Sequence, residues 1–387
     1  MRVLYIASGD CKYGASKSMI EVMLSMKKYY GVEPVLLTRK RNQLNTICDE
    51  LGIENYVFWN RDIMAGSAYS NPILNMLKHI VKYGLYLYGG ISQSRVDKIG
   101  LDFSGIDLIH SNLNRNDIGA YIARRYNIPH IWHLREMGKE DYRVKYYKRN
   151  CILYLNENAD AFIAISKCVE KVWRERGIQE DKLYLVYNGI DISHFREKLP
   201  RNDGKINIIM TGHIQLTKGQ DQLIRAIGLL EKEIKSKICV DFYGEAYSDY
   251  KKQLDRYVRE YNLEDVVHFC GYCDNVPSKL SEYDIGVVCS KAEGFGRVTV
   301  EYMAAGLAVL ASDTGANPEL IENGVSGLLY QYNCPEDMAE KIRYLVEDES
   351  KRKEIAEVGN QRVKNCYTTE RNVEGIYRVY QSVLGHV

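Results

Sequence analysis

The chain has 387 residues, more than one ordinary hydrophobic core contains, so its length alone fits two domains or three. Its 52 basic and 51 acidic residues leave a net charge of +1, which excludes a globally polycationic nucleic-acid binder, and we expect no nucleic-acid partner. Ten cysteines without framework spacing indicate a reducing compartment and mostly buried thiols.

The chain start, MRVLYIASGD, has only a short apolar run before Gly9 and Asp10, which predicts a strand rather than a signal peptide. No apolar run approaches the roughly 18 residues of a membrane span. We therefore expect a soluble, cytoplasmic protein.

Short apolar runs alternate with amphipathic stretches through the first half. The expected strands are 3–8, 34–38, 107–112, 130–134, 161–166 and 183–189, and helices are expected at 16–30 and 117–126. Near-continuous apolar strands that each feed a helix are typical of a doubly wound parallel sheet. The first half is therefore predicted to be Rossmann-like.

The polar run REKLPRNDGK, residues 196–205, has the composition of a linker between compact units. The alternation then restarts, with strands expected at 206–213, 238–245, 266–272, 284–290, 308–313 and 327–331. We expect a first Rossmann-like domain at 1–195 and a second at 206–367. Ligands of such sheets bind beyond the carboxyl ends of the strands, so a cleft between two facing domains is expected to hold the substrate.

The loop after the first strand, ASGDCKYGASKS, has Gly9 and Gly14 at the spacing of a phosphate-binding P-loop. That motif requires Lys and Ser/Thr after the second glycine, and here Ala15 and Ser16 follow. The loop is therefore interpreted as a glycine turn close to a ligand, not as an NTPase site.

Residues 61–150 contain 14 basic and 8 acidic residues, with lysine and arginine interleaved with aromatics at 78–90 and 143–149. Such segments lie on anionic lipid or recognise an acidic acceptor. An ordinary tyrosine-rich surface explains the pattern equally well, since the chain has 31 tyrosines. A peripheral membrane contact through residues 78–149 is one of these alternatives.

Two histidines, His110 in LIHSN and His133 in IWHLRE, come near the ends of first-domain strands. Ligand contact and a structural role are equally open for them. The Cys270–Cys273 pair lacks a second pair at zinc spacing, and no convincing DxD occurs, so we expect no essential metal.

In the second half, TGHIQLTKGQDQLI puts Lys218 at a strand-to-helix turn, where an ammonium group can meet a diphosphate. SKAEGFGRVTVEYMAAG then puts Glu293 after a strand, a glycine turn behind it, and a helix from Arg297 to Ala305. A helix N-terminus favours an anion, and Glu301 in that helix can reach hydroxyl groups beside it. The alternative for this motif is a solvated turn with two surface acids.

These motifs together resemble glycosyltransferase family 4, retaining enzymes of the GT-B fold that use nucleotide sugars. The resemblance covers the first glycine loop, DLIHSN, WHLRE, AFIAIS, VYNGID, the KGQ loop and the block SKAEGFGRVTVEYMAAGLAVLASDTGANPELIENGVSGLL. It implies that residues 368–387 form a helix crossing back to the first domain.

The resemblance also implies site roles. Glu293 and His133 approach the donor sugar, Lys218 binds the diphosphate, and Glu301 binds the ribose. Donor binding further involves Gly14, His213, Gly294, Phe295, Gly296 and Arg297, and the catalytic set is His133, Glu293 and Lys218. His110, Arg135 and Glu136 are candidates for the acceptor side or cleft. His213 stands where the family usually has arginine, and Arg297 is expected to supply the missing charge.

The implied function is transfer of a sugar from a nucleoside diphosphate, most readily UDP, to a glycan or lipid-linked acceptor, without a required cofactor. By resemblance the product belongs to a bacterial capsule, exopolysaccharide or lipopolysaccharide, which places the enzyme in the cytoplasm or at the inner face of the membrane. The alternatives are a nucleotide-sugar epimerase of the same fold and a weakly active sugar-nucleotide-binding protein.

Overall fold

The computed structural model describes residues 1–7, 14–65, 72–138, 144–195, 204–246 and 248–385. The chain forms two compact units. Unit 1 comprises residues 1–189 and 369–387, and unit 2 comprises residues 190–368. Of the segment expected to link the domains, residues 196–203 lie outside the described part, as does Gly9 of the first glycine loop.

Unit 1 contains a seven-stranded sheet in which every neighbouring pair is parallel. Its strand order is β3 (Asn55–Val57), β2 (Glu33–Thr38), β1 (Arg2–Ala7), β5 (Leu108–Ser111), β6 (His130–Leu134), β8 (Ala161–Ala164) and β9 (Leu183–Leu185). The order reverses between β1 and β5, which is the topological switch point of a Rossmann-like sheet. A short antiparallel pair, β4 (Met64–Ala65) and β7 (Lys145–Tyr146), stands apart from this sheet.

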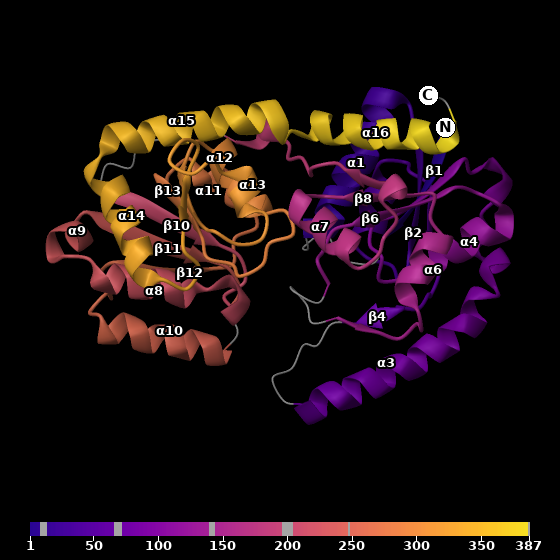
Figure 1. Ribbon diagram of the computed structural model, residues 1–387, viewed down its shortest axis with the longest axis horizontal. Helices are drawn as coiled ribbons and strands as arrows, with labels where there is room; N and C mark the ends of the chain where they lie inside the picture. The colour runs from indigo at the N-terminus through magenta and orange to yellow at the C-terminus, as the bar shows by residue number, and fades with distance from the viewer. Residues whose placement is uncertain (8–13, 66–71, 139–143, 196–203, 247, 386–387) are drawn as a thin grey trace. The chain divides into compact units, whose positions relative to one another are not determined.

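The helices of unit 1 are α1 (Gly14–Tyr30), α2 (Gln43–Glu50), α3 (Pro72–Gln93), α4 (Ile118–Tyr126), α6 (Cys151–Glu157), α7 (Lys167–Glu175) and α16 (Thr369–Leu384). Figure 1 shows α16 beside α1, so the last helix of the chain completes the unit that the first residues begin. Val373, Ile376 and Val379 of α16 are buried in the same core cluster as Val3 and Met23. This burial makes α16 an integral part of the hydrophobic core of unit 1.

Unit 2 contains a six-stranded parallel sheet. Its order is β12 (Val267–Gly271), β11 (Ile238–Tyr243), β10 (Ile206–Thr211), β13 (Ile285–Val288), β14 (Ala308–Ser312) and β15 (Leu328–Tyr330). The strand order again reverses, here between β10 and β13. The doubly wound parallel sheets predicted from the sequence are confirmed in both units.

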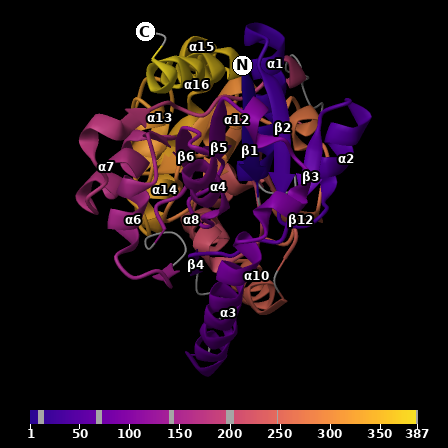
Figure 2. The same cartoon turned by 90° about the vertical axis from the view of Figure 1, so that its right-hand side faces the viewer.

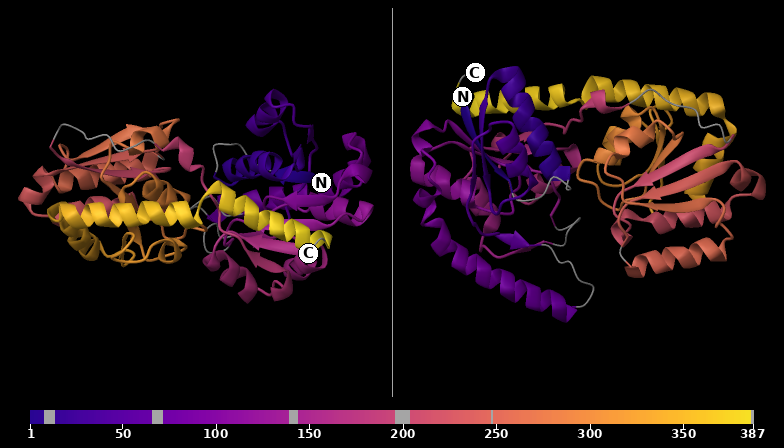
Figure 3. Two further views of the ribbon diagram at one scale, coloured as in Figure 1. Left: turned by 90° about the horizontal axis from the view of Figure 1, so that it is seen from above. Right: turned by 180° about the vertical axis from the view of Figure 1, so that it is seen from behind.

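Helices cover both faces of the unit 2 sheet (Figure 3). They are α8 (Gln220–Leu229), α9 (Lys232–Ser236), α10 (Ser248–Glu260), α11 (Val276–Leu280), α12 (Arg297–Ala304), α13 (Asn317–Leu320), α14 (Pro335–Glu347) and α15 (Glu349–Cys366). Apolar residues of α8, α10 and α14 pack with the strands in one core cluster. On β13, Gly286 admits α12 closely, because a Cβ there would lie 2.3 Å from the Tyr302 ring.

Candidate functional site

The loops that follow β10 and β13 meet at the switch point of unit 2. Lys218, in the short 3-10 turn Leu216–Lys218, places Nζ 2.6 Å from Oε1 of Glu293. Because β10 and β13 are neighbours, their carboxyl ends bring together two residues that are 75 positions apart. Two of the residues singled out in the sequence, Lys218 and Glu293, therefore form an ion pair with each other.

A glycine holds the Lys218 turn against the β13 side. Gly219 has φ +73°, and a Cβ there would lie 2.6 Å from the Cys289 carbonyl oxygen. Only glycine tolerates this backbone conformation at such a close approach. The backbone therefore determines the position of Lys218, and the long side chain of this lysine reaches Glu293.

Glu293 is anchored from the opposite side by the loop after β14. Its carbonyl accepts a hydrogen bond from the Ala316 N–H at 2.9 Å, and Gly315, with φ +59°, leaves no room for a Cβ beside the Glu293 backbone. Burial disfavours the charged carboxylate, but the charge of Lys218 and hydrogen bonds from Lys218 and Ser290 hold the pKa of Glu293 below its ordinary value. Glu293 is therefore an anion that is kept ionised by its partner.

The glycine turn after Glu293 ends at Gly296, which has φ +80° and precedes the first residue of α12. Phe295 between the glycines is buried and packs edge-on against the Tyr367 ring, so the turn offers a ligand its backbone rather than this side chain. Among the described residues, no side chain forms a capping hydrogen bond at the N-terminus of α12. One turn into the helix, Glu301 accepts a hydrogen bond from Arg297 Nε at 2.9 Å.

His213 follows β10 and is half-buried. Its carbonyl accepts a hydrogen bond from Gln220 Nε2 at 3.0 Å, which fastens the loop to the first turn of α8. Gly14 lies at the first residue of α1, is exposed, and has open space around its Cβ position.

In unit 1, His110 and His133 are fully buried side chains on the neighbouring strands β5 and β6. His110 Nε2 lies 3.0 Å from His133 Nδ1, and His110 Nδ1 lies 2.5 Å from the Tyr380 hydroxyl of α16. Burial, followed by the positive charge of Arg135, lowers the pKa of both imidazoles well below the ordinary 6.5. Both rings are therefore neutral at physiological pH.

The hydrogen bonds fix the tautomer of His133. Arg135 Nη2 lies 3.3 Å from His133 Nδ1, and a guanidinium can only donate, so Nδ1 accepts and the proton of the neutral ring is on Nε2. By the same logic His110 donates through Nε2 and accepts at Nδ1 from the Tyr380 hydroxyl. Among the described residues, the buried His133 Nε2 has no hydrogen-bond partner. A buried donor of this kind can bind a ligand or a water molecule.

The residues next to His133 are held in place by partners that we did not single out in the sequence. Arg135 donates to Oδ1 of Asn112 and, at 2.8 Å, to Oδ1 of Asn188. Glu136 pairs with Arg115 through two bonds of 2.5 Å. Both asparagines lie in quoted motifs, DLIHSN and VYNGID, and each motif follows an apolar strand, which was the signal that could have identified them. Tyr380 had no such signal, since it lies 270 positions from His110.

Two family descriptions match the chain: Glycosyltransferase Family 4 over residues 52–194 and Glycosyl transferases group 1 over residues 191–362. An uncharacterized glycosyltransferase of Methanocaldococcus jannaschii is 29% identical over 320 residues, which are 81% of this chain and 86% of the relative. A Campylobacter jejuni protein named N-acetylgalactosamine-N,N'-diacetylbacillosaminyl-diphospho-undecaprenol 4-alpha-N-acetylgalactosaminyltransferase is 27% identical over 273 residues, 67% of this chain and 72% of the relative.

Solved structures share the fold. HepE of Anabaena in complex with UDP superimposes with a TM-score of 0.80 at 21% identity, covering 99% of this chain and 100% of that one. A glycosyltransferase from Rickettsia africae gives 0.78 at 19% identity, covering 100% and 99%. At these identities the likeness concerns the fold, and it confirms the predicted GT-B class. Among the described residues, no helix is long and apolar enough to cross a membrane.

The Lys218–Glu293 pair predicts opposite pH dependences of stability in wild type and a variant. The folded wild type has a lowered Glu293 pKa, so this contribution is present above the ordinary value of 4.5 and is lost as pH falls through the lower folded value. In Lys218→Met, only the Ser290 hydrogen bond still opposes burial, which is the largest effect, so the pKa of Glu293 should rise. We expect a free energy of unfolding lower by about 1–3 kcal/mol at pH 7, with the deficit shrinking as pH falls toward 5.

Urea unfolding between pH 4 and 8 measures this difference. The double variant Lys218→Met, Glu293→Gln is the matched control, because it removes the unpaired charge and should recover most of the loss at pH 7. A Lys218→Met deficit that stays constant with pH would show that the pair does not determine the ionisation of Glu293.

Proposed function

Since the chain belongs to the family 4 glycosyltransferases, we propose that it transfers a sugar from a nucleoside diphosphate, most readily UDP, to a hydroxyl of a glycan or lipid-linked acceptor, with retention of configuration. The observation that carries this proposal is the charge arrangement at the switch point of unit 2. There, Lys218 and Glu293 meet after β10 and β13, the location at which sheets of this kind bind nucleotides.

In this proposal donor binding is an exchange of partners. The ammonium group of Lys218 leaves Glu293 for the diphosphate, and Glu293, freed of its cation, accepts hydrogen bonds from the sugar hydroxyls. The N-terminal end of α12 is proposed to attract a phosphate oxygen as well, because a helix N-terminus favours an anion. In the bound state Lys218 would therefore pair with the diphosphate, and Glu293 would accept hydrogen bonds from the sugar, so neither charge would be buried without a partner.

Glu301 is proposed to bind the ribose. Its carboxylate already accepts a hydrogen bond from Arg297, which orients it one turn into α12. Arg297 lies in the first turn of α12 and is proposed to supply, beside the diphosphate, the positive charge that the family's usual arginine would carry at position 213.

The transfer step is proposed to rest on electrostatic stabilisation of the departing diphosphate by Lys218, Arg297 and the α12 amides. His133 contributes a neutral donor, because its Nε2 carries the only proton on the ring. That N–H is proposed to bind an oxygen of the donor sugar, which orients the sugar without adding a positive charge near its anomeric carbon. In this assignment His110, Tyr380 and Arg135 are positioning residues that fix the His133 tautomer.

Unit 1 also carries an exposed apolar face, proposed to contact anionic membrane lipid and so to reach a lipid-linked acceptor. The residues of α3 exposed to solvent include Ile73, Leu74, Met76, Leu77, Ile80, Val81, Tyr83, Leu85, Leu87, Tyr88 and Ile91. In Figure 2 α3 extends away from the sheet of unit 1. The helix has no acidic residue, and it carries Lys78 and Lys82. An apolar face flanked by lysines is typical of a helix lying in the membrane interface.

Donor binding is tested by thermal shift of the purified chain with UDP, GDP, ADP and their common sugar conjugates. We expect one nucleotide family to stabilise the protein, by about 2.7 kcal/mol at 100 times its dissociation constant. Glu301→Ala should weaken nucleoside diphosphate binding by roughly 1–3 kcal/mol through lost charge-assisted bonds, whereas the surface variant Glu340→Ala should not. No shift with any nucleotide would contradict the proposal, and conversion of the donor sugar without acceptor would indicate an epimerase.

The His133 assignment predicts a split between the kinetic constants. Tyr380→Phe removes the hydroxyl that orients His110, and we expect kcat to fall by roughly 10-fold while the affinity for nucleoside diphosphate stays the same. His133→Ala should lower kcat further, with the same unchanged affinity. Steady-state kinetics with isothermal titration measures both, and an equal loss of nucleotide affinity would refute the division of roles.

The α3 assignment is tested by sedimentation with vesicles. Wild type should bind vesicles that contain phosphatidylglycerol, and Ile80→Asp with Val81→Asp should weaken that binding by at least about 10-fold, because two charges enter the interface. Leu229→Asp, at an exposed apolar position of α8, is the matched control. Wild type that stays in the supernatant at low salt would contradict a membrane contact.

A further inference from the structure

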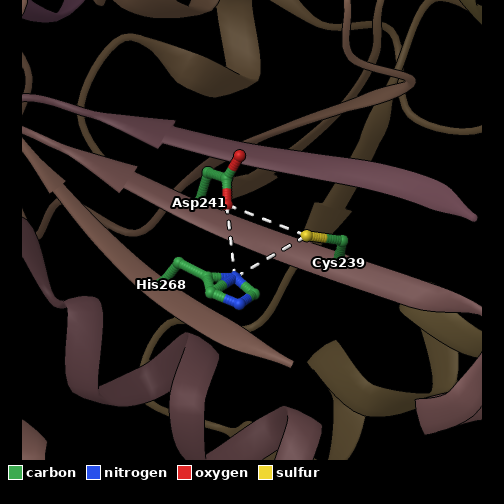
Figure 4. Close-up of side chains that lie close together, drawn as sticks. All are labelled: Cys239, Asp241 and His268. Carbon is green, nitrogen blue, oxygen red and sulfur yellow. Dashed lines mark hydrogen bonds and ion pairs between the residues drawn. The ribbon is translucent and has the colours of Figure 1, made fainter. Parts of the chain in front are cut away.

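Three metal-ligating side chains lie together on one face of the unit 2 sheet, apart from the donor loops. Cys239 and Asp241 are two residues apart on β11 and therefore point to the same face. His268, on the edge strand β12, is the register partner of Asp241. Figure 4 shows the sulfur, one carboxylate oxygen and a ring nitrogen converging on a common point.

The distances among these three atoms suit a tetrahedral ion. Cys239 Sγ lies 3.8 Å from Asp241 Oδ1 and 3.7 Å from His268 Nδ1, and that nitrogen lies 3.5 Å from Asp241 Oδ1. A zinc ion at about 2.3 Å from sulfur and about 2.0 Å from nitrogen and oxygen separates its tetrahedral ligands by about 3.5 Å and about 3.3 Å. A contraction of a few tenths of an ångström would therefore complete the geometry.

We propose that Cys239, Asp241 and His268 form a binding site for a divalent ion of the zinc class. A thiolate, an imidazole and a carboxylate together favour such an ion over magnesium or calcium, which require oxygen ligands. On binding, the Cys239 thiol releases its proton to solvent and forms the metal–sulfur bond, with no change of oxidation state.

The second oxygen of the carboxylate is already fixed. Asp241 Oδ2 accepts a hydrogen bond of 2.5 Å from the Tyr283 hydroxyl, and Tyr283 is fully buried just before β13. A bonded carboxylate keeps its other oxygen oriented toward an ion, as supporting residues of metal sites do. The Asp241 side chain is itself 8% exposed, so the ligand set has one rigid member.

The other side of the site is open. The side chain of His268 is 46% exposed, and Cys239 is half-buried, so an ion has a path from solvent. The fourth position would be taken by water, since three protein ligands come together. The bound ion would link the edge strand β12 to β11 just before the irregular register between Phe242 and Tyr243.

This site is independent of the donor site. Its β11 ligands lie in the first four residues of the strand, whereas donor ligands are proposed on loops beyond the strand ends. The expectation of no essential metal for the transfer step is separate from this proposal. Sequence reasoning weighed Cys270 and Cys273 instead, because CxxC spacing is visible in the sequence and pairing between β11 and β12 is not.

Cobalt titration of the metal-free full chain tests the proposal. We expect one equivalent of Co²⁺ to produce a thiolate-to-cobalt charge-transfer band and Zn²⁺ to displace it. Cys239→Ser should abolish the band, and His268→Gln, at an exposed position that does not threaten folding, should weaken cobalt binding at least about 10-fold. Cys270→Ser is the matched control on β12 and should retain wild-type binding.

Two results would overturn the proposal. One is the absence of a charge-transfer band in wild type at micromolar Co²⁺. The other is a band that survives in Cys239→Ser but disappears in Cys270→Ser or Cys273→Ser, which would move the ion to the CxxC pair. Nucleoside diphosphate binding, measured in parallel, should be the same in all four variants, so failure of this site and failure of the donor site are distinguishable.

Discussion

The ion pair between Lys218 and Glu293 is the interaction on which the proposed chemistry depends. Parallel pairing of β10 with β13 brings the two loops together, and Gly219 and Gly315 fix their backbones at distances that a Cβ would forbid. The pair holds a cation and an anion side by side at the place where an anionic donor is expected. Because the pair is partly buried, separating the two charges costs free energy unless each one finds another partner.

The buried, hydrogen-bonded side chains of His133, His110 and Tyr380 in unit 1 have a different role in the proposed chemistry. In the proposed reaction, a protonated His133 would oppose the positive charge that develops on the sugar. Burial and the nearby Arg135 keep His133 neutral, and the donating Arg135 guanidinium determines that the proton is on Nε2. His110 and then Tyr380 extend this hydrogen-bond chain from His133 Nδ1. The C-terminal helix α16 thus contributes to the candidate site through a hydrogen-bond chain as well as through core packing.

Local patterns predicted most of the fold. The strands expected at 130–134 and 308–313 are observed at His130–Leu134 and Ala308–Ser312, and the helix expected from Arg297 to Ala305 is observed at Arg297–Ala304. Continuous apolar runs and a terminal glycine such as Gly306 determine these elements locally. The motif residues Glu293 and Lys218 were found for the same reason, since each lies in the loop that follows an apolar strand, β13 or β10.

The partners of those residues could not be predicted in this way, because they depend on which strands become neighbours. The sequence around Lys218 does not show its 2.6 Å contact with Glu293. The sequence around His110 likewise does not show its 2.5 Å contact with Tyr380. The same holds for Cys239 and His268, which are separated by a helix and meet only through the β11–β12 register. Sequence patterns identify the reactive groups, whereas pairing across the sheet decides their charge, tautomer and possible ligands.

The two sheets share a topology but place different chemistry at their switch points. Unit 2 has two pairs of an acidic and a basic side chain there, Lys218 with Glu293 and Arg297 with Glu301, whose basic members suit a diphosphate that carries negative charge before and after the transfer. Unit 1 has neutral imidazoles. Arg135 donates hydrogen bonds to two asparagines, and Glu136 forms an ion pair with Arg115. A sugar whose charge is transient needs oriented dipoles rather than fixed charges. This difference in local electrostatics, more than the fold, favours assigning the nucleotide to unit 2 and the orientation of the sugar to unit 1.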